Sequence, residues 1–307
     1  MDLVLLVLTF IVNFIMNFIF WVVVHGIVDL LVIYNIMDLV FPLNLVPRHD
    51  EQGLIILFSV LSTLCILIPA IVFRYGPFQW LLIFSNGGRK AKGENLEKLQ
   101  KIMDLVCARA NLNWESFKLY TYKKDPYNAF ALGTNNIVVS EDMLSDFSFE
   151  EVCGVVAHEM GHLQKGHTKM LLWAEGMSWF GNIVVSFYSL LYLAGRILCF
   201  IPFLGFLIAI VVAAFFVFLQ ILNFILDIPM FLITRFGSRK DEYAADAYAS
   251  AIGLGVELAC SLQHIDDIMG NKRLSFFERL AADHPDVPYR IKRLGELENK
   301  RNASPIE

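Results

Sequence analysis

The stretch EEVCGVVAHEMGHLQKGH, residues 150–167, contains two histidines, His158 and His162, that are four positions apart. Ser148 and Glu151 form a capping-box pattern, which predicts that a helix begins here. Residues four apart in an α-helix differ by about 40° around its axis, so both imidazoles face the same side, one turn apart. Two imidazoles placed in this way can bind one tetrahedral zinc ion.

The residue after the first histidine is Glu159, which completes the pattern H-E-x-x-H. A glutamate here can reach a metal-bound water and act as its general base, as in zinc metalloproteases. The longer pattern H-E-x-x-H-x-x-G-x-x-H is excluded, because Lys165 and Thr168 occupy its glycine and last histidine positions. His167 is off that register, and we expect it to be an exposed residue at the helix end, where positive charge is favourable.

A third protein ligand is expected on a later helix, in the stretch SRKDEYAADAYASAIG, residues 238–253. Glu242 and Asp246 are four apart and share one face of this helix. Glu242 would complete a His₂Glu site and leave the fourth position to water. Asp246 would accept a hydrogen bond from a ligand imidazole, which we expect to be His158, and so fix its tautomer. The alternative for Glu242 is a solvated acid at a helix start, but the small residues around it favour close helix packing.

Much of the remaining chain is apolar. Of its 307 residues 56% are hydrophobic, and the mean hydropathy is +0.55. Runs of about 20 apolar residues can cross a bilayer as helices, so we expect a multi-pass membrane protein. The first run has no basic flank and no cleavage site, which predicts a retained anchor. Four spans are predicted, at 3–24, 53–73, 171–195 and 199–233. Residues 27–46 are expected to form an interfacial helix, with a fifth span as the alternative.

Lysine and arginine are distributed unevenly around these spans. None occurs before Arg48, whereas clusters of them follow Phe73 and Ile233. Positive residues collect on the cytoplasmic side, so both polar blocks are predicted to be cytoplasmic and the chain to lie in the cell (inner) membrane. If His162 and Glu242 share one metal ion, the apolar run between them must cross the membrane an even number of times.

The predicted fold is mainly α and membrane-embedded, with four (or five) transmembrane helices and a cytoplasmic α+β domain of the zincin type. An amphipathic helix is expected at 94–110, followed by the β-rich pieces FKLYTY, NAFAL and NIVVS, which would form a small sheet. Further helices are expected near 240–253, 256–268, 274–282 and 287–300. The predicted organisation is a membrane hairpin with an interfacial segment at 1–84, the first half of the catalytic domain at 85–170, a second hairpin at 171–233, and the second half of the catalytic domain at 234–307.

Cysteine spacing and charge exclude other classes. The five cysteines show no C-x-x-C spacing, so neither a disulfide framework nor a cysteine zinc site is expected. The net charge is −5 and no basic surface stands out, so no nucleic-acid partner is expected.

HEMGH at 158–162, two predicted spans and then SRKDEYAAD at 238–246 resemble the HtpX-type membrane zinc metalloproteases, relatives of the CAAX prenyl proteases. PYNAFALG at 126–133 and DHPDVPYRIKRL at 283–294 also resemble segments of that family. The resemblance implies that Asn128 and Ala129 line the cleft as an edge strand that pairs with an extended substrate. It further implies that His284 and Arg290 polarise the scissile carbonyl and stabilise the oxyanion. The alternatives are a plain structural strand, a helix-entry turn and a surface arginine.

The sequence therefore predicts a membrane-anchored zinc endopeptidase with one zinc ion per chain and polypeptide substrates, with damaged membrane proteins implied by the resemblance alone. A prenyl-protein protease is one alternative, disfavoured because such enzymes look like larger bundles with about seven spans. An intramembrane protease is disfavoured by Glu150, Glu151, Lys165 and Lys169 beside the motif, since charge is expensive at membrane depth. A non-catalytic scaffold or holdase with a structural zinc is the third alternative.

Overall fold

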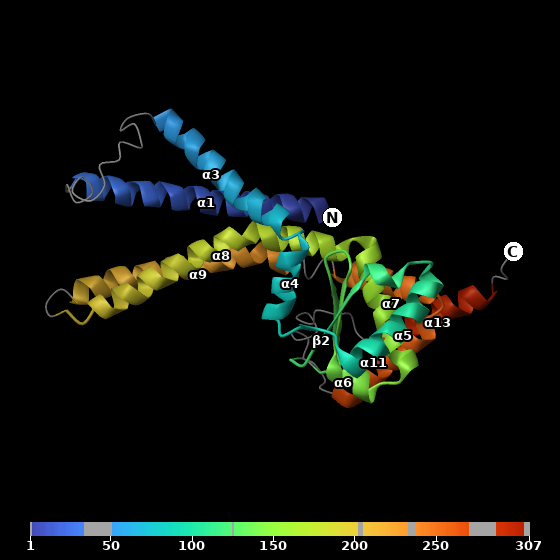
Figure 1. Ribbon diagram of the computed structural model, residues 1–307. Helices are drawn as coiled ribbons and strands as arrows, with labels where there is room; N and C mark the ends of the chain where they lie inside the picture. Colours follow the sequence, from blue (N-terminus) through green and yellow to red (C-terminus); the bar gives the residue numbers. More distant parts are fainter. Residues whose placement is uncertain are drawn as a thin grey trace. The chain divides into compact units, whose positions relative to one another are not determined.

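The computed structural model describes residues 2–33, 51–124, 126–201, 205–232, 238–269 and 287–303 (Figure 1). The chain divides into two compact units. The first unit comprises Met1–Phe73 and Trp173–Leu232, and the second comprises Arg74–Leu172 and Ile233–Glu307. Each unit is thus made of two segments that lie far apart in the sequence. The division into membrane and catalytic segments at 1–84, 85–170, 171–233 and 234–307 stays a prediction.

The first unit consists of long apolar helices. They are α1 (Asp2–Ile33), α3 (Glu51–Val72), α8 (His167–Leu198) and α9 (Gly205–Leu232). Among the described helices, four contain a segment long and apolar enough to cross a membrane: Leu3–Gly26, Gln52–Val72, His167–Leu198 and Gly205–Leu222. The four predicted spans are confirmed, and the chain is a multi-pass membrane protein.

The first helix ends later than predicted. It continues to Ile33, because the residues after Gly26 are again apolar and a single glycine does not stop the helix. Residues 27–33 of the segment predicted as an interfacial helix are thus helical and continuous with α1, and their place at the membrane interface stays a prediction. Residues 34–50 lie outside the described residues.

Close packing inside the first unit uses both large and small side chains. Met16 of α1, Tyr188 of α8 and Leu222 of α9 are buried in one apolar cluster. Gly176 of α8 faces α3, and a Cβ added there would come within 2.5 Å of the Cα of Ala70. Small residues at such points let membrane helices approach closely.

The second unit contains a four-stranded sheet in the order β1-β2-β4-β3. Strands β2 and β4 are parallel, and the two outer pairs are antiparallel. Strand β3 therefore lies at an edge of the sheet. The three predicted β-rich pieces are confirmed as strands, whereas β1 is a two-residue strand that was not predicted. The strands are β1 (Arg89–Lys90), β2 (Lys118–Tyr122), β3 (Ala129–Leu132) and β4 (Asn136–Ser140).

Helices make up most of the second unit. The predicted helix at 274–282 lies outside the described residues. The described helices are α4 (Gly76–Ser85), α5 (Gly93–Ala110), the 3₁₀-helix η1 (Trp114–Ser116), α6 (Glu141–Asp146), α7 (Phe149–Lys165), α10 (Ser238–Ala251), α11 (Gly255–Met269) and α13 (Val287–Ala303). A mainly helical membrane fold with a small sheet is thus confirmed.

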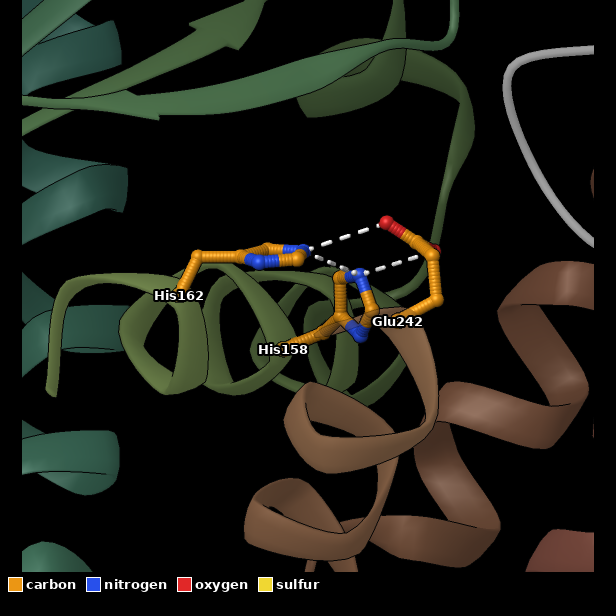
Figure 2. A group of neighbouring side chains, drawn as sticks. All are labelled: His158, His162 and Glu242. Atoms are coloured by element: carbon orange, nitrogen blue, oxygen red, sulfur yellow. Dashed lines mark hydrogen bonds and ion pairs between the residues drawn. The ribbon is translucent and has the colours of Figure 1, made fainter. Parts of the chain in front are cut away.

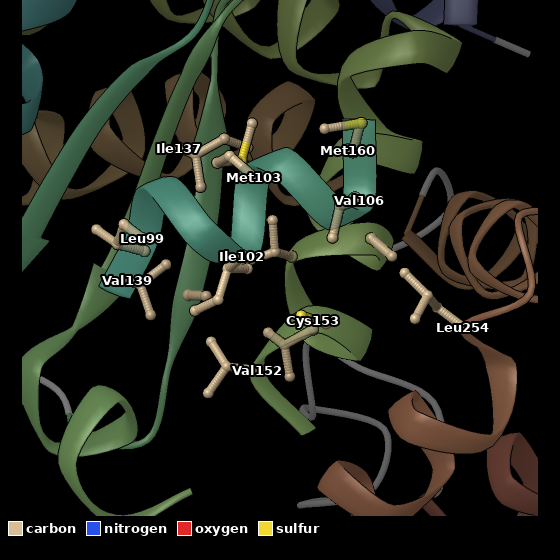
Figure 3. Packing of buried hydrophobic residues seen from close by; sticks show 14 of the residues in the cluster. Leu99, Ile102, Met103, Val106, Ile137, Val139, Val152, Cys153, Met160 and Leu254 are labelled. Atoms are coloured by element: carbon tan, nitrogen blue, oxygen red, sulfur yellow. The ribbon is translucent and has the colours of Figure 1, made fainter. Parts of the chain in front are cut away.

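Helix α7 is at the centre of the second unit's core. Figure 3 shows Met103 and Val106 of α5 near Met160 and Cys153 of α7, and all four are buried in one cluster. Glycines bring two further helices close to α7. A Cβ added at Gly154 would come within 2.3 Å of the backbone of α11, and one at Gly161 within 2.9 Å of the backbone of α10.

Candidate metal centre

Local sequence sets both ends of α7. The Ser148 hydroxyl accepts a hydrogen bond from the Glu151 backbone N–H, and the Glu151 carboxylate accepts one from the Ser148 backbone N–H. The predicted capping box is therefore confirmed. At the other end Gly166 adopts a left-handed conformation with φ 77°, which an L-side chain rarely adopts. The helix stops there, and α8 begins at His167.

Three side chains from α7 and α10 converge near the C-terminal end of α7. His158, His162 and Glu242 point toward one another in Figure 2, and one potential ligand atom from each lies within 4.8 Å of the others. The Nε2 atoms of the two imidazoles are 3.2 Å apart. One oxygen of Glu242 is 3.2 Å from Nε2 of His162, and the other is 3.5 Å from Nε2 of His158. Glu242 is only 4% exposed, so the solvated alternative does not apply.

These separations fit a tetrahedral zinc ion. With ligand distances of about 2.0–2.1 Å, neighbouring ligands of a tetrahedral site lie about 3.4 Å apart. The distance between the two Nε2 atoms, 3.2 Å, is near that value, and so are the contacts of the imidazoles with the two Glu242 oxygens, at 3.2 and 3.5 Å, while single ligand atoms of all three residues lie within 4.8 Å of one another. The donor set of two nitrogens and one carboxylate is also one that catalytic zinc sites use. The residues present therefore fit the ion, and their assignment as its ligands stays a prediction.

Buried acids favour positive charge at His158. Its Nδ1 lies 2.9 Å from Oδ1 of Asp246, the contact that was predicted from their spacing. Burial lowers the pKa of His158, but hydrogen bonds to Asp246 and Glu242 outweigh it and raise the pKa to about 9. Burial raises the pKa of Asp246, but hydrogen bonds from His158 and Arg290 hold it below its usual value. A cation at Nε2 would replace the histidine's proton, since both compete for the same lone pair.

Arg290 of α13 completes this acidic network. Its Nε donates to Asp246 Oδ2 at 2.9 Å, and Nη1 lies 3.0 Å from a Glu242 oxygen. The residue is 4% exposed, so the surface alternative does not apply. Its guanidinium contacts both carboxylates, and this geometry favours a role in which Arg290 orients Asp246 and Glu242. Direct contact with an oxyanion stays a prediction, and His284 lies outside the described residues.

Glu159 faces the edge strand. Its carboxylate accepts a hydrogen bond of 2.9 Å from the backbone N–H of Ala131 in β3. Backbone groups alternate in direction along a strand, so Ala129 presents its backbone to the same open edge. The side chain of Asn128 is exposed and that of Ala129 is buried. Pairing of this edge with a substrate stays a prediction.

The expectation for His167 is wrong. Its side chain is 19% exposed and lies against a predicted zinc ligand, with Nδ1 3.1 Å from Nδ1 of His162. Its Nε2 lies 3.2 Å from Oδ1 of Asp241. Five positions along one helix would put His167 and His162 on different faces, but α7 ends at Gly166, whose left-handed conformation interrupts the helix. Gly166 was the feature of the sequence that could have predicted this turn. For Asp241 the sequence offered no such feature apart from its position next to Glu242.

The sequence matches a known family over most of the second unit and over helices α8 and α9. The profile of peptidase family M48 matches residues 94–298. The chain belongs to this family. Membership of M48 implies a metal cofactor, typically zinc, and it confirms the family resemblance noted in the sequence. None of the four candidate spans among the described helices contains α7, so the M48 motif lies outside them.

The chain is also similar to two named proteins and to one solved structure. Protease HtpX homolog of Halobacterium salinarum is 26% identical over 213 residues, 67% of this chain and 66% of that protein. Protease HtpX of Pseudomonas fluorescens is 35% identical over 151 residues, 47% of this chain and 48% of that protein. The matches thus span less than two thirds of either relative. The crystal structure of S. mikatae Ste24p is similar with a TM-score of 0.46 and 20% identity, over 88% of this chain and 62% of that chain.

Proposed function

We propose that the chain is a membrane-anchored zinc endopeptidase that hydrolyses peptide bonds of polypeptides presented at the cytoplasmic face of the membrane. The observation that carries this proposal is the convergence of His158, His162 and Glu242 beside Glu159, which itself touches the edge strand. Membership of family M48 supports it independently. One zinc ion per chain is proposed, because one group of three ligands is found among the described residues.

Each residue of the site has a separate proposed role. The Nε2 atoms of His158 and His162 and the carboxylate of Glu242 would hold the ion. When bound, zinc lowers the pKa of a coordinated water and polarises a carbonyl group. The Glu159 carboxylate accepts the proton of the attacking water and then donates it to the leaving amine. The contact with Ala131 N–H holds this carboxylate at the open edge of the sheet.

The open edge of β3 is the proposed substrate site. An extended peptide can add to an exposed strand edge through main-chain hydrogen bonds, with little dependence on its sequence. Ala129 would pair with such a peptide through its backbone. Asn128 would contact it through its exposed side chain, because its backbone N–H and C=O already bond to Ser140. Glu159 would then lie beside the peptide backbone. This mode suits unfolded or misassembled polypeptides, because a folded substrate rarely offers an extended segment. Damaged membrane proteins are the proposed substrates.

The orientation rests on charge. Lysines and arginines follow the predicted spans at Phe73 and Ile233, whereas none precedes Arg48. This asymmetry supports a cytoplasmic location for the second unit and insertion in the cell (inner) membrane.

Substitution of the general base tests the proposal. Glu159→Gln should keep bound zinc and lower the cleavage rate of an unfolded membrane-protein substrate by about 100- to 10,000-fold, because general base catalysis contributes factors of that size. Glu150→Gln is the matched control, since Glu150 is an exposed glutamate on the same helix. Cleavage by the Glu159 variant at the rate of the control would contradict the proposal.

A further inference from the structure

The two predicted histidine ligands have different outer partners. The Nδ1 of His158 meets a carboxylate directly, that of Asp246. The Nδ1 of His162 meets another imidazole, that of His167, at 3.1 Å, and the His167 Nε2 in turn lies 3.2 Å from the carboxylate of Asp241. A metal-ligating histidine commonly donates its second ring N–H to a fixed acceptor, which sets its tautomer and orientation.

The tautomers follow from which nitrogen faces the ion. The Nε2 atoms of His158 and His162 face each other at 3.2 Å and both approach Glu242, so Nε2 must carry the free lone pair in each ligand. The proton of His162 is then on Nδ1, which donates to Nδ1 of His167. That leaves the proton of His167 on Nε2, which donates to Asp241. With these tautomers, His162 donates to His167 and His167 donates to Asp241, so each N–H in the series has an acceptor.

We propose that His167 and Asp241 form a relay that positions His162 for metal binding. The inference rests on the proposed function, because it assumes that His162 is a ligand. His167 is a positioning residue and not a fourth ligand, since it lies on the Nδ1 side of His162, away from the two Nε2 atoms. The relay also begins at the first residue of α8, a candidate membrane span. His167 lies in the part of α8 that belongs to the second unit, so the relay lies within that unit.

The turn at Gly166 makes the relay possible. In a continuous helix, residues five apart differ by about 140° around the axis and do not face each other. The left-handed conformation of Gly166, with φ 77°, ends α7 and lets α8 start in a new direction. The His162 and His167 rings then meet edge to face, with centroids 5.4 Å apart. In the pattern H-x-x-x-G-H at 162–167, the glycine ends the helix, and the second histidine then lies beside the first.

Metal affinity of the full-length protein in detergent tests the relay. His167→Phe keeps an aromatic ring but removes the acceptor, so zinc affinity, measured by chelator competition, should fall by about 10- to 100-fold. The absorption bands of the Co²⁺-substituted protein should shift as well, because the orientation of His162 changes. His167→Asn retains an acceptor near the position of Nδ1 and should recover part of the affinity. Asp241→Asn should lower it by about 10-fold.

The controls separate this inference from the proposed function. His264→Gln changes a histidine that contacts Glu151 at 3.1 Å, outside the metal centre, and should leave zinc affinity unchanged. His162→Ala should abolish tight binding, and retention of zinc by that variant would overturn the metal centre itself. Loss of zinc in His162→Ala with normal affinity and an unshifted Co²⁺ spectrum in His167→Phe or Asp241→Asn would overturn the relay alone. If His167→Phe fails to fold, the Asn variants decide the outcome.

Discussion

The two halves of helix α7 are held in place in different ways. Residues 149–157 are fixed by a local capping box and by apolar packing against α5 and α11. Residues 158–165 also reach the apolar core, through Met160 and Leu163, but they add polar contacts to side chains far along the sequence, among them Glu242 and Arg290. Each half contains one glycine at its closest helix contact, Gly154 against α11 and Gly161 against α10.

The first half of α7 therefore serves mainly to stabilise the fold, whereas the second half also positions the predicted metal ligands. Apolar burial is non-directional and tolerates small shifts of the partner helix. A ligand set requires fixed distances between atoms and loses affinity when one element moves. Substitutions in the first half should therefore reduce stability with little effect on metal binding, and those around the second half should affect metal binding.

The largest effect on stability is expected at Arg290, which supports the second half. Arg290→Met leaves Asp246 and Glu242 buried with less compensating charge, so the free energy of unfolding should fall by about 3–5 kcal/mol. Arg293 is the matched control on the same helix. Its guanidinium lies 4.4 Å from the ring centroid of Tyr243, and Arg293→Met should cost no more than about 1 kcal/mol. Thermal unfolding in detergent gives both values, and equal losses would contradict a special role for Arg290.

The two glycines give the sharpest contrast between the halves. Gly161→Ala places a methyl group 2.9 Å from the Cα of Ala245, so α10 must move and carry Glu242 with it. We expect a loss of about 1–3 kcal/mol in stability and of about 10- to 100-fold in zinc affinity. Gly154→Ala places its methyl 2.3 Å from the backbone of Leu258 and should destabilise at least as strongly. Folded Gly154→Ala protein should nevertheless bind zinc normally, and a matching loss of affinity would erase the contrast.

The smallest effect is expected at the capping box. Ser148→Ala should reduce stability by about 1 kcal/mol without changing zinc affinity. Burial raises the pKa of Glu151, but hydrogen bonds from Ser148 outweigh it and hold the pKa below its ordinary 4.5. A lowered pKa contributes stability above pH 4.5 that is lost as the pH falls through the folded-state value. The stability difference between wild type and Glu151→Gln should therefore be present at pH 7 and vanish in acid, and a constant difference would argue against the cap.

The same contrast explains what could be predicted from sequence. The capping box, the amphipathic helix at 94–110 and the four spans follow from local patterns, and all are confirmed. The proximity of Glu242 to His158 and His162 depends on the packing of distant segments, and the prediction drew on motif spacing and family resemblance. The placement of His167 was missed, because the left-handed conformation of Gly166 ends a helix that periodicity alone would continue. The burial of Arg290 was also not foreseen, since its partners come from another segment.

We propose that α7 and α10, separated in sequence by two membrane spans, hold one metal ion together. Metal analysis of purified wild type, Glu242→Ala and Glu298→Ala tests it most directly, because Glu298 is a comparably buried carboxylate, 7% exposed, that bonds to Ser250 outside the site. We expect about one zinc ion per chain in wild type and in Glu298→Ala, and loss of most zinc from Glu242→Ala. Zinc content in Glu242→Ala equal to that of wild type would contradict it.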